Sequence, residues 1–203
     1  MRDPYFDELK KTYLAAGHRL YIVGGTSRDM LLARPYDDLD FVSDATVDES
    51  RLFLKDADFT FAKYGSLRVK VKDKRADVTT LREEGEYFDF RHPSHIKFVR
   101  SPEEDYSRRD FTINAIYIDE DYKIIDYVHG LDDLHKGLIR FIGDPYIRIK
   151  EDPLRILRAY RFEKVLGFKI EEKSLKAMEE LSCLVDKLNK EKVAEEKRKA
   201  ERK

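Results

Sequence analysis

The sequence contains a single cysteine and no tryptophan, and its charges nearly cancel to a formal net charge of −1. The one cysteine, Cys183, excludes an intramolecular disulfide and a zinc cluster built on several cysteines. No apolar run approaches the length of a membrane span, and the N-terminus lacks a secretory pattern, so we expect a cytoplasmic protein without membrane contact. A net charge this small gives no global basic field for nucleic acid, so any RNA contact must come from a local patch.

Charged residues are abundant instead, at 40% of the 203 residues, a length that allows one domain with a smaller appendage. The densest basic stretch is R-V-K-V-K-D-K-R at residues 68–75. Such a stretch is a candidate RNA contact. The alternative, and the more common case for alternating charge, is the solvated face of a strand or hairpin.

Residues 20–40 hold the most informative pattern of the chain. The apolar residues 20–23 predict a short strand, and Gly24 and Gly25 then permit a tight turn. Thr26 or Ser27 is expected to cap the helix that follows. A glycine turn that leads into a helix N-terminus offers backbone N–H groups and a positive dipole end, which suit a phosphate.

Two acidic residues follow this helix at a spacing of two. We expect Asp38 and Asp40 to begin a strand, where a period of two places both carboxylates on one face. Arg28, predicted in the first helical turn, opposes the helix dipole unless an anionic ligand compensates it. A glycine turn alone, or a D-x-D pair alone, is usually structural. Together they favour a triphosphate site beside Mg²⁺, because Mg²⁺ prefers hard oxygen ligands.

This segment resembles the head of the polymerase-β-like nucleotidyltransferases, in the branch that holds the class II CCA-adding tRNA nucleotidyltransferases and the bacterial poly(A) polymerases. Three more segments are similar to motifs of that branch. They are A-D-V-T-T-L-R at 76–82, E-E-D-Y-S-R-R-D-F-T-I-N-A at 103–115 and E-D-P-L-R-I-L-R-A-Y-R-F at 151–162. The resemblance runs from about residue 21 to residue 168, in the order of the family.

The expected fold class is α+β, with a mixed, partly antiparallel sheet and helices in a nucleotidyltransferase head, followed by a helical neck. We place the head at residues 1–140 and the neck, with its nucleobase-template helix, at 141–203. The expected strands are 20–23, 38–43, 59–63, 67–72, 76–81, 115–118 and 123–127, and the expected helices are 3–16, 48–55 and several from residue 144 onward.

Three further local features are predicted. Residues 83–94 are polar and rich in turn formers, and are expected to form a mobile loop. Ser101 and Glu104 are spaced as a capping box for a helix toward Arg108. The terminal residues 187–203 are polar on all sides, so we expect a frayed helix or one cut from its partners. The body and tail domains that hold tRNA in the resembled family are lacking, which favours a truncated chain.

The resemblance also assigns roles to single residues. Asp38 and Asp40 would be the catalytic ligands of Mg²⁺, and Asp77 would be a third catalytic carboxylate that orients the attacking hydroxyl. The triphosphate would be held by Gly24, Gly25, Arg28 and Arg109. The neighbouring Arg108 has a structural alternative, as a partner of Asp105 or Asp110.

The template helix would select the base. Asp152 and Arg155 are three apart and are expected to share a helical face. A carboxylate acceptor beside a guanidinium donor matches the amine and ring nitrogen of cytosine and adenine, but not uracil or guanine. Arg158 and Arg161 continue the face and would also contact the nucleotide. From spacing alone this would be an ordinary salt-bridged face, and the resemblance reverses that interpretation.

The function implied is template-independent addition of C and/or A to the tRNA 3′ end from CTP and ATP. A poly(A) polymerase is the first alternative, but K-Y-G-S-L-R-V at 63–69 is closer to the H-G-T-x-x-V of the CCA-adding branch, with Tyr64 and Ser66 as departures. An A-adding or C-adding specialist is the second. A non-catalytic nucleotide- or RNA-binding relative is a third, against which the three retained carboxylates argue. The oligomeric state is open.

Overall fold

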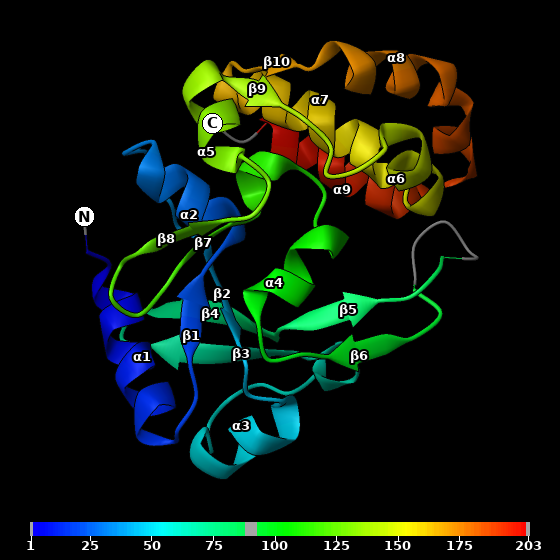
Figure 1. The fold of residues 1–203 in the computed structure, drawn as a ribbon. Coiled ribbons are helices and arrows are strands. Elements are labelled where there is room, and N and C mark those ends of the chain that lie inside the picture. Colours follow the sequence, from blue (N-terminus) through cyan, green and yellow to red (C-terminus); the bar gives the residue numbers. More distant parts are fainter. Residues whose placement is uncertain (1, 88–92, 202–203) are drawn as a thin grey trace. The chain divides into compact units, whose positions relative to one another are not determined.

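The computed structural model describes residues 2–87 and 93–201, and these residues form two compact units (Figure 1). The first unit comprises Met1–Glu83, Ile96–Arg108 and Asn114–Tyr127, and the second comprises Glu84–His95, Arg109–Ile113 and Val128–Lys203. No helix in the described part of the chain is long and apolar enough to cross a membrane.

The first unit is built on a six-stranded mixed sheet with the strand order β3-β4-β2-β1-β7-β8. The pair β2 and β4 is parallel, and the other neighbouring pairs are antiparallel. The strands are β1 (Leu20–Ile22), β2 (Leu39–Ser43), β3 (Ser66–Val71), β4 (Lys74–Thr80), β7 (Ile116–Ile118) and β8 (Ile124–Asp126). Two short strands, β5 (Arg82–Glu84) and β6 (Ile96–Phe98), form a separate two-stranded sheet. The mixed sheet and its helices confirm the α+β class predicted from the sequence.

One face of this sheet is buried beneath the first helix, α1 (Pro4–Ala15), as Figure 1 shows. The core on that side contains Phe6 and Leu9 of the helix and alternate residues of the strands, such as Phe41 and Val78. The alternation matters for function, because residues between these apolar positions must point to the opposite face. The first unit also contains the helices α2 (Gly24–Leu31), α3 (Val47–Phe53) and α4 (Pro102–Asp105).

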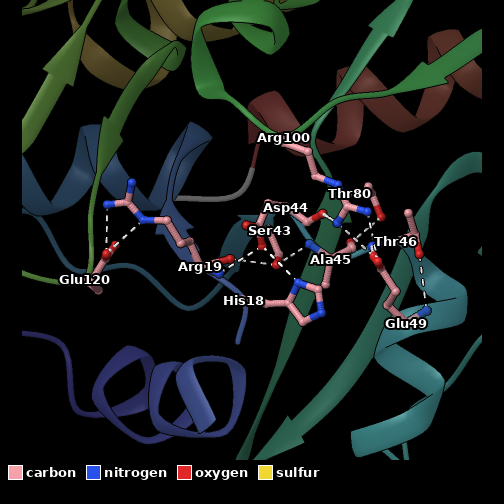
Figure 2. A network of polar contacts seen from close by, with 10 residues as sticks. All are labelled: His18, Arg19, Ser43, Asp44, Ala45, Thr46, Glu49, Thr80, Arg100 and Glu120. Atoms are coloured by element: carbon pink, nitrogen blue, oxygen red, sulfur yellow. Dashed lines mark hydrogen bonds and ion pairs between the residues drawn. The ribbon is translucent and has the colours of Figure 1, made fainter. Parts of the chain in front are cut away.

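A network of polar contacts fixes the end of β2 to α3 (Figure 2). Thr46 and Glu49 form a capping box at the start of this helix. The Arg100 guanidinium donates to both carboxylate oxygens of Glu49 at 2.9 and 2.8 Å. Beyond β2, the Asp44 carboxylate accepts from the backbone N–H of Arg19 at 2.8 Å. These contacts hold the far end of the strand that carries Asp40.

The second unit is mainly helical. Its helices are α5 (Gly130–Lys136), α6 (Pro145–Glu151), α7 (Leu154–Leu166), α8 (Glu172–Glu180) and α9 (Lys190–Glu201), and a parallel pair joins β9 (Leu138–Ile139) to β10 (Lys169–Ile170). A 3₁₀ turn at Ser182–Lys187 lies in this unit, those at Ala62–Tyr64 and Tyr106–Arg108 lie in the first unit, and the one at Thr112–Asn114 includes residues of both. Phe111 contacts Phe141 and Phe162 in the core of the unit. The division of the chain at residue 140 stays a prediction.

Several predicted elements differ from the structure. The strand expected at 59–63 is wrong, because Asp58 accepts from the backbone and hydroxyl of Thr60 and a 3₁₀ turn follows that ends at Gly65 in the left-handed region. Ser101 does cap α4, but its hydroxyl accepts from the N–H of Glu103 and no capping box with Glu104 forms. Of the loop expected at 83–94, residues 88–92 lie outside the described residues, as do 202 and 203 of the terminal segment.

Candidate functional site

The acidic residues of the first unit are brought together by the register of two parallel strands. Asp40 on β2 is paired directly with Asp77 on β4, so the two side chains share a face of the sheet. Asp38 lies two residues before Asp40 and just outside β2, which begins at Leu39. Asp38 and Asp77 are exposed and Asp40 is half-buried. Asp77 therefore lies on a strand adjacent to β2, as the sequence predicts.

A hydroxyl that the sequence analysis missed holds the backbone of this acidic pair. The Thr26 side chain is buried, and its Oγ1 donates to the carbonyl of Asp38 at 2.9 Å and accepts from the N–H of Asp40 at 2.8 Å. One side chain of α2 thus replaces a strand partner at the beginning of β2. The signal in the sequence was a threonine after the glycine turn, which we assigned to a cap.

That cap assignment is wrong, because α2 begins at Gly24 and its N-cap is Val23, without a side-chain cap. Gly24 has a φ of +70°, a conformation open to glycine, and a Cβ placed there would lie 3.3 Å from Oδ2 of Asp40. A Cβ on Gly25 would lie 3.4 Å from the same oxygen. The two glycines therefore let the helix N-terminus approach the carboxylate closely.

The early start of α2 also changes the place of Arg28. This residue lies in the last turn of the helix, not the first, so its charge does not oppose the dipole. Its side chain is buried and donates through Nε and Nη2 to the two oxygens of Asp29, at 2.9 and 2.8 Å. Nη1 donates to Oδ1 of Asn114 at 2.9 Å, a residue that we had not singled out. The guanidinium is already balanced within the protein.

Asp77 has a cationic partner on the neighbouring strand. Arg68 of β3 is its register partner and donates to both of its oxygens, from Nε at 2.6 Å and from Nη2 at 3.1 Å. The pKa of Arg68 is raised mainly by its hydrogen bond with Asp77, and the charge of Asp38 contributes to the same shift. Among residues 2–87 and 93–201, no three His, Cys, Asp or Glu side chains gather closely enough to hold a metal ion.

The chemical type of the nearby side chains nevertheless suits Mg²⁺. Asp38 and Asp40 supply hard carboxylate oxygens close in sequence, and two glycines leave the space beside Oδ2 of Asp40 that side chains would otherwise fill. A cation there would also relieve repulsion between acids on one face.

The second unit pairs its arginines with buried acids. Arg158 donates through Nε and Nη2 to Oδ2 of Asp110, the former at 2.7 Å. Burial opposes the charge of Arg158, but Asp110 outweighs it and the pKa of Arg158 is raised. Arg109 is half-buried, and its carbonyl accepts from Nη2 of Arg148 at 2.8 Å. In the first unit, Nε of Arg108 donates to Oδ1 of Asp105 at 2.8 Å, which confirms the structural alternative for this arginine.

Asp152 and Arg155 do not share a helical face, so that prediction is wrong. Pro153 follows Asp152 and disfavours helical backbone there, and Asp152 is extended, with φ −147° and ψ 96°. It lies between α6 and α7, where its Oδ1 accepts from the N–H of Leu154 at 3.0 Å. Arg155 is buried on α7, and its Nη1 donates to Oε2 of Glu151 at 2.8 Å and to the carbonyl of Arg148 at 2.7 Å.

Arg161 connects α7 to the last helix. Its Nε donates to Oε2 of Glu196 at 2.8 Å, and the Glu196 side chain is only 5% exposed. Burial lowers the pKa of Arg161, and Glu196 counteracts this effect. The helix α9 packs on α7, whereas the polar composition of residues 187–203 predicted a frayed helix or one cut from its partners.

Residues 20–140 match a family model described as the poly A polymerase head domain. The chain is 41% identical over 191 residues to a CCA-adding enzyme of Streptococcus gordonii, which covers 94% of this chain and 47% of that enzyme. A CCA-adding enzyme of Pediococcus pentosaceus is 44% identical over 88% of this chain and 45% of its own length.

Solved structures agree with these matches. The Bacillus stearothermophilus CCA-adding enzyme in complex with CTP has a TM-score of 0.89 and 33% identity over 98% of this chain and 49% of its own. The Thermotoga maritima CCA-adding enzyme complexed with tRNA_CCA has a TM-score of 0.77 and 27% identity, over 98% and 48%. This chain spans about half the length of these proteins. The family match over more than half of the chain shows that it belongs to the poly A polymerase head domain family.

Proposed function

We propose that this chain carries the catalytic part of a tRNA nucleotidyltransferase, which adds C and/or A to the tRNA 3′ end from CTP and ATP with Mg²⁺. The observation that carries the proposal is the pairing of Asp40 with Asp77 beside the glycine-rich N-terminus of α2. The names of the relatives support it, and the two solved relatives contain CTP and tRNA_CCA. A cytoplasmic location and the division into head (1–140) and neck (141–203) belong to the same proposal.

Asp38 and Asp40 would hold the magnesium ions. When bound, Mg²⁺ would lower the pKa of the attacking 3′-hydroxyl and neutralise charge on the triphosphate. Thr26 would keep both carboxylates in place through the two backbone hydrogen bonds of its hydroxyl. Asp77 would orient the 3′-hydroxyl from the neighbouring strand, while two hydrogen bonds from Arg68 hold its carboxylate in one orientation.

The phosphates would be bound by backbone and guanidinium groups. The N–H groups at the N-terminus of α2, from Gly24 and Gly25, suit a phosphate because the helix dipole is positive there. Arg28 would attract the same anion while it stays anchored to Asp29. Arg109 would add a second positive charge. These groups would position the α-phosphate and would not themselves react with it.

Base selection would fall to Asp152 and Arg155. The carboxylate of Asp152 would accept from the exocyclic amine of cytosine or adenine, and Arg155 would donate to the ring nitrogen. Within the described residues, hydrogen bonds engage only Nη1 of Arg155, which leaves Nε and Nη2 to serve a base. Uracil or guanine would leave buried polar groups unpaired, which costs affinity. Arg158 and Arg161 would contribute positive charge near the nucleotide.

The catalytic assignment can be tested with labelled CTP and ATP on tRNAs that end before the first C or after CC, and on unrelated RNA. We expect Asp40→Asn and Asp77→Asn to lower incorporation by roughly a hundredfold or more. Asp121→Asn is the matched control, since its side chain is 71% exposed in the β7–β8 turn. Wild-type-like incorporation by Asp40→Asn, with the fold intact by circular dichroism, would refute the carboxylate assignment.

The same assay separates the alternatives. Repeated addition of A to unrelated RNA would indicate a poly(A) polymerase, and addition of only one kind of nucleotide would indicate a specialist. Binding of CTP without transfer to any RNA would indicate a non-catalytic relative.

The template assignment needs its own variant. Arg155→Lys keeps the charge beside Glu151 but removes the paired donors, and Lys164→Ala, exposed at the end of α7, is the control. We expect the ratio of kcat/KM for CTP over UTP to fall roughly tenfold or more in Arg155→Lys. An unchanged ratio would mean that other residues select the base.

A further inference from the structure

The hairpin of β3 and β4 presents a row of polar pairs on the face that carries Asp40 and Asp77. The register pairs Ser66 with Thr79, Arg68 with Asp77, and Lys70 with Arg75. Between these positions the strands bury apolar residues such as Val69 and Ala76 on the opposite face. Because Asp77 is also the partner of Asp40, the whole row lies on the side of the proposed catalytic carboxylates.

In each of the first two pairs of this row, the two side chains bind each other. The hydroxyls of Ser66 and Thr79 are 3.0 Å apart and share a hydrogen bond. Arg68 and Asp77 form the ion pair with two hydrogen bonds described above. Both pairs have the complementary chemistry that stabilises neighbouring strands.

The third pair is different, because it places two cations opposite each other. Lys70 and Arg75 are both exposed, and in the described part of the chain neither forms an ion pair or a side-chain hydrogen bond. Arg75 acts on Asp58, whose pKa is lowered first by its hydrogen bonds with Thr60 and also by Arg68 and Arg75. Like charges directly opposite destabilise a hairpin, so an anion from outside the chain would relieve them.

The position of the cations favours one kind of anion. Two residues along a strand advance about 6.6 Å, so the pair lies roughly one such step from Asp77. That is comparable with the reach of one nucleotide from a 3′-hydroxyl at Asp77. Lysine and arginine are the residues that most often contact nucleic-acid phosphates, and such contacts position the chain without reading its sequence.

We propose that Lys70 and Arg75 bind the sugar–phosphate backbone of the RNA close to its 3′ end and guide that end toward Asp77. This inference rests on the proposed nucleotidyl transfer, and it identifies part of the RNA-binding surface of the same site. The rival explanation is protection of the sheet, since β3 is an edge strand and lysines discourage edge-to-edge association.

The test measures binding of a short single-stranded RNA, labelled at its 5′ end, by fluorescence anisotropy over a range of salt concentrations. The variant is Lys70→Gln/Arg75→Gln. The control Lys11→Gln/Lys123→Gln makes the same change of charge at two side chains that are 73% and 74% exposed elsewhere in the first unit. Lys70→Arg keeps the charge and should bind RNA like the wild type.

We expect the double variant to bind RNA on the order of tenfold more weakly at low salt, and to reduce the slope of log K against log salt by about 1.4, or 0.7 for each lost phosphate contact. CTP affinity, measured separately, should match the wild type, which would assign the loss to RNA. Equal RNA affinity and slope in the two double variants would overturn the inference. So would a wild-type chain that binds no RNA at low salt.

Measuring nucleotide incorporation as well as RNA binding distinguishes a failure of the proposed function from a failure of the basic surface. If the wild-type chain binds RNA with the expected slope but incorporates neither CTP nor ATP, the catalytic proposal fails while the basic surface stands. If incorporation occurs and Lys70→Gln/Arg75→Gln leaves RNA binding unchanged, the surface fails alone. Increased self-association of this variant, without any loss of RNA affinity, would support edge protection instead.

Discussion

Replacing Thr26 with valine tests how the chain holds its acidic pair. Valine keeps the branched shape of threonine but lacks the hydroxyl, which makes two hydrogen bonds to the backbone of residues 38 and 40 at 2.9 and 2.8 Å. The Thr26 residue is 1% exposed, so water cannot readily replace these bonds. Each bond contributes about 1 kcal/mol, and a buried group left without a partner costs about 1–3 kcal/mol. We expect the free energy of unfolding to fall by about 2–4 kcal/mol.

The measurement is urea unfolding followed by far-ultraviolet circular dichroism, which suits a chain without tryptophan. Thr26→Ser keeps the hydroxyl and loses one methyl group, so it should cost only about 1 kcal/mol. Thr12→Val, on the exposed side of α1, makes the same chemical change and should stay within about 0.5 kcal/mol of the wild type. If Thr26→Val is no less stable than Thr12→Val, the hydroxyl does not hold β2 and the reasoning is refuted.

Three further changes test other parts of the structure. The Arg100 guanidinium, together with the capping box, lowers the pKa of Glu49 from 4.5 to about 2. The ionised Glu49 side chain therefore stabilises the fold above pH 4.5, and this contribution is lost as the pH falls toward 2. Glu49→Gln, which can keep the capping box, should therefore cost about 1 kcal/mol at neutral pH, and urea unfolding should find no such difference near pH 2. Glu196→Gln leaves the half-buried Arg161 without its carboxylate partner and should speed proteolysis within α9. An unchanged rate of proteolysis would mean that this ion pair does not hold α9 on α7. Gly24→Ala should lose about 1–2 kcal/mol in the same urea assay, because its φ is +70° and the added Cβ crowds a carboxylate, and equal stability would contradict this.

The strands that carry the acidic residues could be predicted because their signals are local. Alternation of buried and exposed residues over 67–71 and 76–80 matches the structure closely, and Asp77 is on the strand next to β2. The register that sets Asp77 against Asp40 could not be derived in this way. It depends on a pairing between segments 37 residues apart, which local pattern does not specify.

The wrong predictions arose where one residue changes the backbone locally. Pro153 keeps Asp152 extended and starts α7 at Leu154, although the spacing of Asp152 and Arg155 by itself suits a helix. In α2, glycines that normally weaken a helix occupy its first two positions, because the turn and the nearby Asp40 leave no room for side chains. In both places, the residues around the motif decide its shape, and the motif alone does not.

The arginines of α7 show why charge pattern could not separate structural from ligand-binding roles. Arg158 turns both Nε and Nη2 to one oxygen of Asp110, and Arg161 pairs with a glutamate 35 positions later. A ligand phosphate that recruited either residue would have to compensate a buried carboxylate, which is costly. In the described part of the chain, the side-chain hydrogen bonds of Arg155 all come from Nη1, so it can be fixed in place and still present Nε and Nη2. Of the three arginines, Arg155 is therefore the one whose contacts best suit base selection, and Arg158 and Arg161 would act through their charge.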